Sequence, residues 1–159
     1  MTALDRFWGK VVKTPDCHFW VGAVSDDGYG RFHVEGRAVR PHRWLLEQSG
    51  GLDNPAHDAM HDCDETLCVR LGPGHVVAGP HAVNLADMAR RGRGAGPWHR
   101  GRGDVRGPHG RALAIRAALA GGYDPDRLAA AMAEGDPDRH WPRLFDDELQ
   151  PITEEGTTT

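Results

Sequence analysis

The most informative stretch of this chain is His61-Asp-Cys63-Asp-Glu-Thr-Leu-Cys68, which holds two of the three cysteines. Four residues separate its two cysteines, six more separate Cys68 from His75, and the third cysteine, Cys17, lies far upstream in a segment predicted as strand. Three thiolates and one imidazole make a closed tetrahedral zinc site, and a full set of protein ligands is typical of structural zinc, because catalytic zinc keeps one position open. The sequence therefore predicts structural zinc. The alternative is the burial of three unrelated free cysteines.

The composition is that of a chain that needs a stabilising metal. Only 39% of the 159 residues are hydrophobic, and 21 glycines and 11 prolines make the chain rich in loops. Small domains with so little apolar material usually depend on a metal or on disulfides, and an odd number of cysteines argues against a disulfide framework. Structural zinc contributes about 10–16 kcal/mol to folding in small zinc domains, which would offset the sparse core.

Two other residues of this region suit phosphodiester chemistry. His61 lies two residues before Cys63, so a zinc loop would hold it rigidly while leaving its ring outside the ligand set. A neutral imidazole, with an ordinary pKa of about 6.5, suits general-base work at neutral pH. Asn84 opens the next predicted helix, and its carbonyl oxygen is a hard ligand suited to Mg²⁺. Taken singly, His61 is more often a surface histidine and Asn84 a helix cap, but their shared spacing favours function.

The charge of the chain is unevenly distributed. Eight arginines and a single acid, Asp104, lie between residues 90 and 116, whereas ten acids and three arginines follow from Asp124 to the end. Arginine binds phosphate through a bidentate fork, so the basic segment favours a nucleic-acid partner. The alternative explanation is the codon usage of a GC-rich genome, which raises the arginine content without any function.

The predicted elements are short strands and short helices joined by loops. In chain order they are strands within 17–42, a helix over 42–48, a loop over 52–74, a strand over 75–78, a helix over 82–91, a mobile linker over 92–110, and helices over 111–120 and 124–134. A hairpin turn is expected at Glu35-Gly36, and Asp124 followed by Pro125 predicts the start of the last helix. No run approaches the ~20 apolar residues that cross a bilayer, and the N-terminus has no apolar signal core, so no membrane partner is expected.

The pattern H-x-C-D-x3-C-V…H-V-V-x-G…N-x2-D-M-x2-R-G-R closely resembles phage- and intron-encoded HNH endonucleases of the His-Me finger superfamily. Three upstream blocks resemble the same family: Cys17-x2-Trp20-x-Gly-Ala23, Asp27-Gly-Tyr-Gly-Arg-Phe32 and His42-Arg43. The resemblance covers residues 17–93. It implies an α+β fold: a small ββα-metal (His-Me finger) domain with a β-hairpin and structural zinc, followed by short C-terminal helices.

The resemblance also assigns roles to individual residues. Structural Zn²⁺ falls to Cys17, Cys63, Cys68 and His75. His61 matches the general base, Asn84 matches the ligand of a catalytic Mg²⁺, and Arg31 falls where related homing enzymes place an arginine against the scissile phosphate. An ordinary solvated strand residue is an equally good interpretation of Arg31. Contacts with double-stranded DNA are expected from Arg31, Arg37, Arg43, Arg90, Arg91, Arg93, Arg100, Arg102 and Arg106.

Three departures from the family pattern are specific to this chain. The usual Asn-Pro step after Val69 is replaced by the longer run Arg-Leu-Gly-Pro-Gly, Met60 precedes His61 where many HNH enzymes carry Asp, and Val83 precedes Asn84 where Asp is common. The missing acids are typical of a weakened or specialised enzyme.

The sequence thus divides into a zinc-stabilised HNH nuclease domain (1–93), a basic Gly/Arg-rich linker (94–110), a helical appendage (111–150) and a disordered tail (151–159). The appendage resembles small DNA-binding units, although two packing helices are the simpler interpretation, and its acidic end suits a homodimer or a partner protein. We expect a metal-dependent DNA endonuclease, of the homing or phage-encoded nicking type, in the cytoplasm of a bacterial or phage-infected cell. The alternatives are a zinc-containing DNA-binding module without chemistry and a protein-assembly factor that retains the fold.

Overall fold

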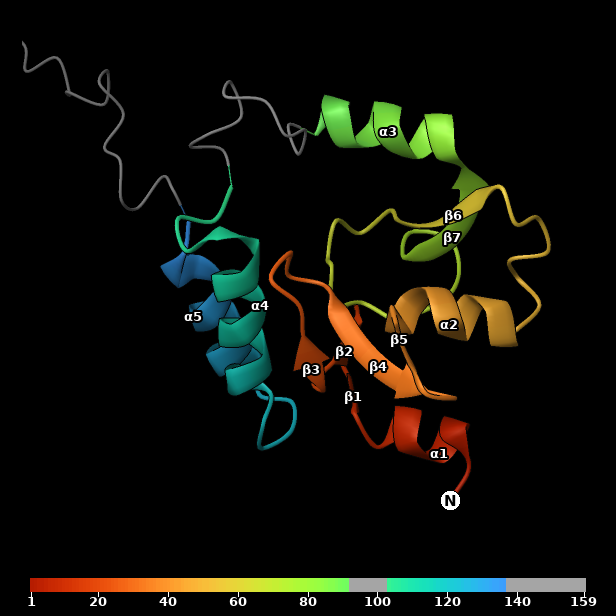
Figure 1. Cartoon of the computed structure of the whole chain (residues 1–159). Helices are drawn as coiled ribbons and strands as arrows, with labels where there is room; N and C mark the ends of the chain where they lie inside the picture. The colour runs from red at the N-terminus through yellow and green to blue at the C-terminus, as the bar shows by residue number, and fades with distance from the viewer. Residues whose placement is uncertain (92–102, 137–159) are drawn as a thin grey trace, which may run out of the picture.

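The computed structural model describes residues 1–91 and 103–136, and these form an α+β fold of short elements (Figure 1). In chain order the elements are α1 (Ala3–Trp8), β1 (Val11–Lys13), β2 (His18–Trp20), β3 (Ala23–Val24), β4 (Gly30–Val34), β5 (Arg37–Val39), α2 (Pro41–Gln48), β6 (His57–His61), β7 (Val76–Pro80), α3 (His81–Arg90), α4 (Gly107–Ala118) and α5 (Pro125–Glu134). Within the described stretches, no helix is long and apolar enough to cross a membrane.

The N-terminal strands form two small antiparallel sheets, β1-β2 and β3-β4-β5. Val34 of β4 pairs with Arg37 of β5, and the two residues between them, Glu35 and Gly36, have φ angles of 52° and 75°. Positive φ at both central residues defines the two-residue turn whose twist matches that of the flanking strands. The predicted hairpin is therefore confirmed, as is the helix after it, which is α2.

A third antiparallel sheet joins β6 to β7, with His61 opposite Val76. The sequence prediction of loop over 52–74 was wrong for residues 57–61. Their polar run His-Asp-Ala-Met-His carries no clear strand alternation, and its hydrogen-bonding partner comes from beyond a long intervening loop. Helix α3 follows β7 directly and packs on both strands, so strand, strand and helix are consecutive in the chain.

Of the two C-terminal helices, α5 begins where the sequence predicted and α4 begins earlier. Helix α5 starts at Pro125, and the Asp124 carboxylate accepts hydrogen bonds from the backbone N–H groups of Asp126 and Arg127, as the capping pattern predicted. Helix α4 starts at Gly107, so the last residues of the predicted linker are helical. The linker residues 94–102, the end of the predicted appendage from 137 and the predicted tail 151–159 lie outside the described residues.

Helix α4 packs against the region of β3, on the side away from α2 and α3 (Figure 1). Gly28, in the turn before β4, lies so close to the start of α4 that a Cβ there would stand 2.5 Å from the carbonyl oxygen of Pro108. His109 hydrogen-bonds the Ser25 carbonyl at 3.0 Å. These contacts fix the first turn of α4 on the N-terminal sheet.

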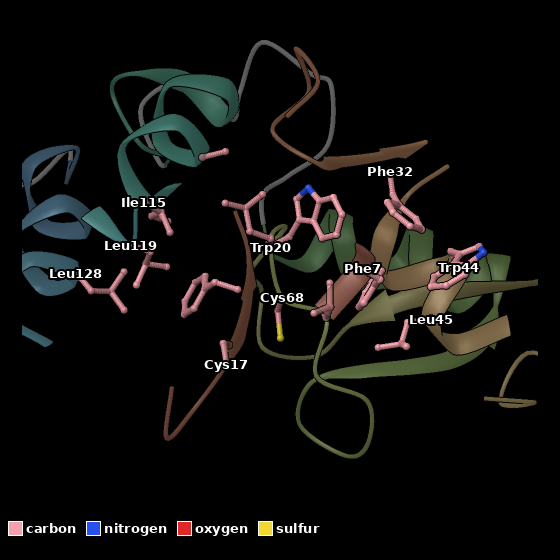
Figure 2. Packing of buried hydrophobic residues seen from close by; sticks show 14 of the residues in the cluster. Phe7, Cys17, Trp20, Phe32, Trp44, Leu45, Cys68, Ile115, Leu119 and Leu128 are labelled. Carbon is pink, nitrogen blue, oxygen red and sulfur yellow. The ribbon is translucent and has the colours of Figure 1, made fainter. Parts of the chain in front are cut away.

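The core is a single cluster of buried side chains with two ends (Figure 2). At one end the rings of Phe7, Trp20, Phe32 and Trp44 pack edge-to-face or tilted, with neighbouring centroids 4.9–5.5 Å apart. The other end holds Ala112 and Ile115 of α4, Leu119 directly after α4, and Leu128 of α5. Figure 2 shows Cys17 and Cys68 between the two ends, so two of the four predicted zinc ligands belong to the cluster.

Candidate functional site

Four side chains that could bind a metal meet beside the β6–β7 sheet. Cys17 precedes β2, Cys63 and Cys68 lie in the loop after β6, and His75 precedes β7. Their ligand atoms all lie within 4.8 Å of one another, and His75 Nδ1 is 3.7 Å from both the Cys17 and the Cys68 sulfur. Tetrahedral zinc with bonds of about 2.3 Å to sulfur and 2.0 Å to nitrogen places its ligands about 3.5–3.8 Å apart. The group therefore fits a metal such as zinc.

The protonation of the three thiols reflects their crowding. The pKa of Cys63 is lowered because the Cys17 and Cys68 groups hydrogen-bond to its thiolate, and the pKa of Cys17 is raised for the same reason. The pKa of Cys68 is raised to about 11, since hydrogen bonding with Cys63 and burial outweigh the opposing hydrogen bond with Cys17. A bound cation would stabilise all three thiolates together.

His61 ends β6 and is buried, with 7% of its surface exposed. Its Nε2 lies 3.0 Å from the Cys68 carbonyl oxygen. Because a carbonyl only accepts hydrogen bonds, Nε2 carries the proton of the neutral ring and Nδ1 is its basic nitrogen. Cys68, whose sulfur belongs to the group of possible metal ligands, thus also fixes the tautomer of His61 through its carbonyl.

Two aromatic side chains pack against His61. The His42 ring, in the first turn of α2, has its centroid 4.3 Å from that of His61, and Tyr29 lies 5.9 Å away. The pKa of His42 is lowered well below the ordinary value by burial and by the nearby His61 and Arg40. No role was predicted for His42 from the sequence, where its only signal was its position beside Arg43 in a family block.

His61 and Asn84 line one pocket of about 350 Å³ between β6, α2 and α3, which we call the β6–α3 pocket. Asn84 lies in the first turn of α3, and its Nδ2 donates to Asp58 Oδ2 at 2.7 Å. His81 Nδ1 lies 2.7 Å from the same oxygen. These two hydrogen bonds lower the pKa of Asp58, so its carboxylate is ionised at neutral pH. Asp58 was not predicted as a site residue, because the family pattern led to acids being expected at positions 60 and 83.

The arginines that line this pocket are Arg40 and Arg43. The Arg40 guanidinium stacks 4.1 Å from the Tyr29 ring centroid and pairs with Asp27 at 2.7 Å. Arg43 pairs with Glu47 at 2.9 Å. Arg31 is exposed on β4 and is not among the residues lining the pocket. Its predicted phosphate contact stays a prediction.

The other arginines predicted to bind DNA differ in their surroundings. Arg37 is exposed, Arg90 pairs with Asp87, and Arg91 pairs with Asp87 at 2.8 Å. Arg106 pairs at 2.7 Å with Asp104, whose side chain is only 7% exposed. Arg93, Arg100 and Arg102 lie outside the described residues. A DNA contact by Arg106 would therefore compete with an ion pair inside the fold.

Comparison with known proteins gives one informative likeness. The chain is similar to Protein 7.7 of Escherichia phage T7, at 38% identity over 80 residues. The aligned part covers 50% of this chain and 60% of the phage protein. No family model matches the chain, and no solved structure matches it significantly. The chain therefore resembles a phage protein over half of its own length.

Proposed function

We propose that the protein is a metal-dependent DNA endonuclease of the HNH type, built on a ββα-metal arrangement of β6, β7 and α3. One observation carries the proposal: His61, its Nε2 bonded to the Cys68 carbonyl, lies in the same pocket as Asn84, next to a group of four metal-ligand side chains. An oriented neutral imidazole, a hard oxygen ligand and cationic side chains in one pocket are what phosphodiester hydrolysis requires.

In this proposal His61 Nδ1 accepts a proton from water as the water oxygen bonds to the scissile phosphorus and the bond from phosphorus to the 3′ oxygen breaks. Asn84 would hold the cation, with Asp58 beside it, and these oxygen donors fit Mg²⁺. When bound, the cation supplies Lewis-acid stabilisation of the charge on phosphate and leaving oxygen. The cysteines and His75 would hold structural zinc, which keeps the loop around His61 rigid.

The substrate in this proposal is double-stranded DNA. Arg40 and Arg43 border the pocket and suit the phosphate on which His61 acts, because guanidinium groups pair with phosphate oxygens. Arg31 and Arg37 on the β4–β5 hairpin would contact flanking backbone. The similarity to a phage protein supports a role in a phage-infected bacterial cell.

A plasmid assay tests the proposal directly. Zinc-loaded protein is incubated with supercoiled plasmid and Mg²⁺, with and without EDTA, and the conversion to nicked or linear DNA is measured. We expect conversion only with Mg²⁺. Absence of conversion at every metal concentration would reject the endonuclease proposal.

One observation favours a second candidate, a DNA-binding module without chemistry. Positions 60 and 83 carry Met and Val instead of the acids common beside the base and the amide. A salt-dependent mobility shift of DNA without cleavage would support this candidate. If the protein neither shifts nor cleaves DNA, the result would favour the protein-assembly factor.

A further inference from the structure

The Met60 sulfur fills the space beside Gly79 of β7 that a Cβ would take. Gly79 is paired with Asp58 of β6, so β7 places no side chain opposite the Asp58 carboxylate. Above it, His81 and Asn84 are three residues apart on α3 and both reach the same carboxylate oxygen. Residues three apart lie on one face of a helix, so the first turn of α3 presents two donors to one point on β6.

The Asp58 carboxylate is accessible from the β6–α3 pocket. The Asp58 side chain is 27% exposed and lines the β6–α3 pocket together with His61. Two N–H donors converge on Oδ2, which marks the point where positive charge is favoured. A rotation of the Asn84 amide by half a turn brings its oxygen to the position of its nitrogen, because the two ends have nearly the same shape. Carboxylate and amide oxygens would then face the same point.

Resting on the proposed function, we propose that Asp58 is a second protein ligand, with Asn84, of the divalent cation in the β6–α3 pocket. Asp58 supplies the carboxylate that this chain lacks immediately before His61. Positions 58 and 60 share a face of β6, since side chains alternate along a strand. The carboxylate is therefore displaced by one pleat, about 6.6 Å along the strand, and the first turn of α3 lies over it.

The experiment measures Mn²⁺ binding by full-length, zinc-loaded protein without DNA, from the loss of the free Mn²⁺ signal in electron paramagnetic resonance. Thiolates prefer zinc and oxygen ligands prefer Mn²⁺ or Mg²⁺, so the zinc group does not interfere. Asp58→Asn keeps the shape and an acceptor oxygen for His81. It should weaken Mn²⁺ binding by about 10–100-fold or more, because the loss of even an outer-sphere partner has an effect of that size.

Asp53→Asn, at an exposed aspartate in the loop before β6, is the matched control and should bind Mn²⁺ like the wild type. Wild-type affinity in Asp58→Asn, or no saturable Mn²⁺ binding by the wild type, would overturn the proposal. A merely structural Asp58 would change the unfolding temperature but not the affinity. If Asp58→Asn loses Mn²⁺ while the wild type never cleaves DNA, the cation site stands and the endonuclease fails. If the wild type cleaves DNA while Asp58→Asn binds Mn²⁺ like the wild type, the endonuclease stands and Asp58 is not a ligand of the cation.

Discussion

Two sites of opposite character border β6. The Cys17, Cys63, Cys68 and His75 group, which could hold a metal such as zinc, is closed: all four ligand side chains come from the protein, three of them are buried, and its donors are mostly sulfur. The β6–α3 pocket alongside β6 is open, and oxygen and nitrogen side chains line it. A closed set of soft ligands suits a structural ion, whereas an open pocket with hard ligands leaves room for substrate.

The two sites share one residue. Cys68 contributes its sulfur to the closed group and its carbonyl to His61 in the open pocket. The two sites are therefore linked through one residue, Cys68.

Removing a ligand from the closed site should have the largest effect. Cys63→Ser should lose zinc and a large part of the roughly 10–16 kcal/mol that such an ion contributes, which exceeds or matches the total stability of most small domains. Metal analysis and circular dichroism measure the two losses. Asp58→Asn, in the open pocket, should keep its zinc. A folded and equally stable Cys63→Ser variant would show that the closed site does not hold the fold.

Removing the base from the open pocket should abolish chemistry and spare the metal group. His61→Ala should lower the cleavage rate by roughly 10²–10⁴, the usual contribution of a positioned general base, while zinc content stays at the wild-type level. His33→Ala, at an exposed histidine of β4, provides the control. Cleavage by His61→Ala at the rate of the control would mean that the proposed mechanism is wrong.

An ion pair joins α4 to the loop between β6 and β7, which carries Cys63, Cys68 and His75 and which we call the zinc loop. This ion pair can be removed separately. Glu65 lies in the loop between Cys63 and Cys68, is only 4% exposed and pairs with Arg111 at 2.7 Å. Arg111→Ala leaves a buried carboxylate without its cation, which should lower the free energy of unfolding by about 3 kcal/mol. Chemical denaturation measures the change.

A matched pair of variants separates this ion pair from general damage to α4. Arg116→Ala removes a nearby arginine that reaches the Gly22 carbonyl through a long hydrogen bond of 3.4 Å, and should cost about 0.5–1 kcal/mol. Adding Glu65→Gln to Arg111→Ala removes the buried charge and should recover part of the loss. An additive double mutant would show that the two side chains do not interact.

Protonation of His42 should lower the stability of the fold in acid. Its folded pKa is depressed, so the unfolded chain binds the proton first. Stability is therefore fully present above the unfolded value of about 6.5 and is lost as the pH falls towards the folded pKa, with a slope of at most about 1.4 kcal/mol per pH unit. His42→Gln should remove this part of the slope between pH 7.5 and pH 5.5. Parallel curves of unfolding free energy against pH for the wild type and His42→Gln would contradict the depressed pKa of His42.

The smallest effects are expected from the basic segment. Arg100→Ala with Arg102→Ala should flatten the plot of log DNA affinity against log salt by about 0.9 for each phosphate that the variant no longer neutralises. Arg106→Ala should instead destabilise the fold, because Arg106 holds the buried Asp104. An unchanged slope in the double variant would show that these two arginines do not bind DNA.

The local parts of this protein were determined by its sequence. The turn at Glu35-Gly36 and the start of α5 at Asp124 were predicted correctly because each depends on the backbone preferences of a few consecutive residues. The metal-ligand group was also predicted, although Cys17 is distant in the chain, because only three cysteines are present and two of them lie in one polar loop. The α+β class is confirmed, and the HNH assignment remains a proposal.

The tertiary structure decided the features that depend on distant partners. Residues 57–61 became a strand only because β7 supplies hydrogen bonds from beyond the zinc loop. Asp58 entered the open pocket because α3 turns back over β6. His42 acquired its depressed pKa from its burial and from the neighbouring His61 ring. Neither residue type nor spacing signals such contacts. Burial and proximity are properties of the folded chain, so the environment of a side chain is settled only when segments far apart in sequence pack together.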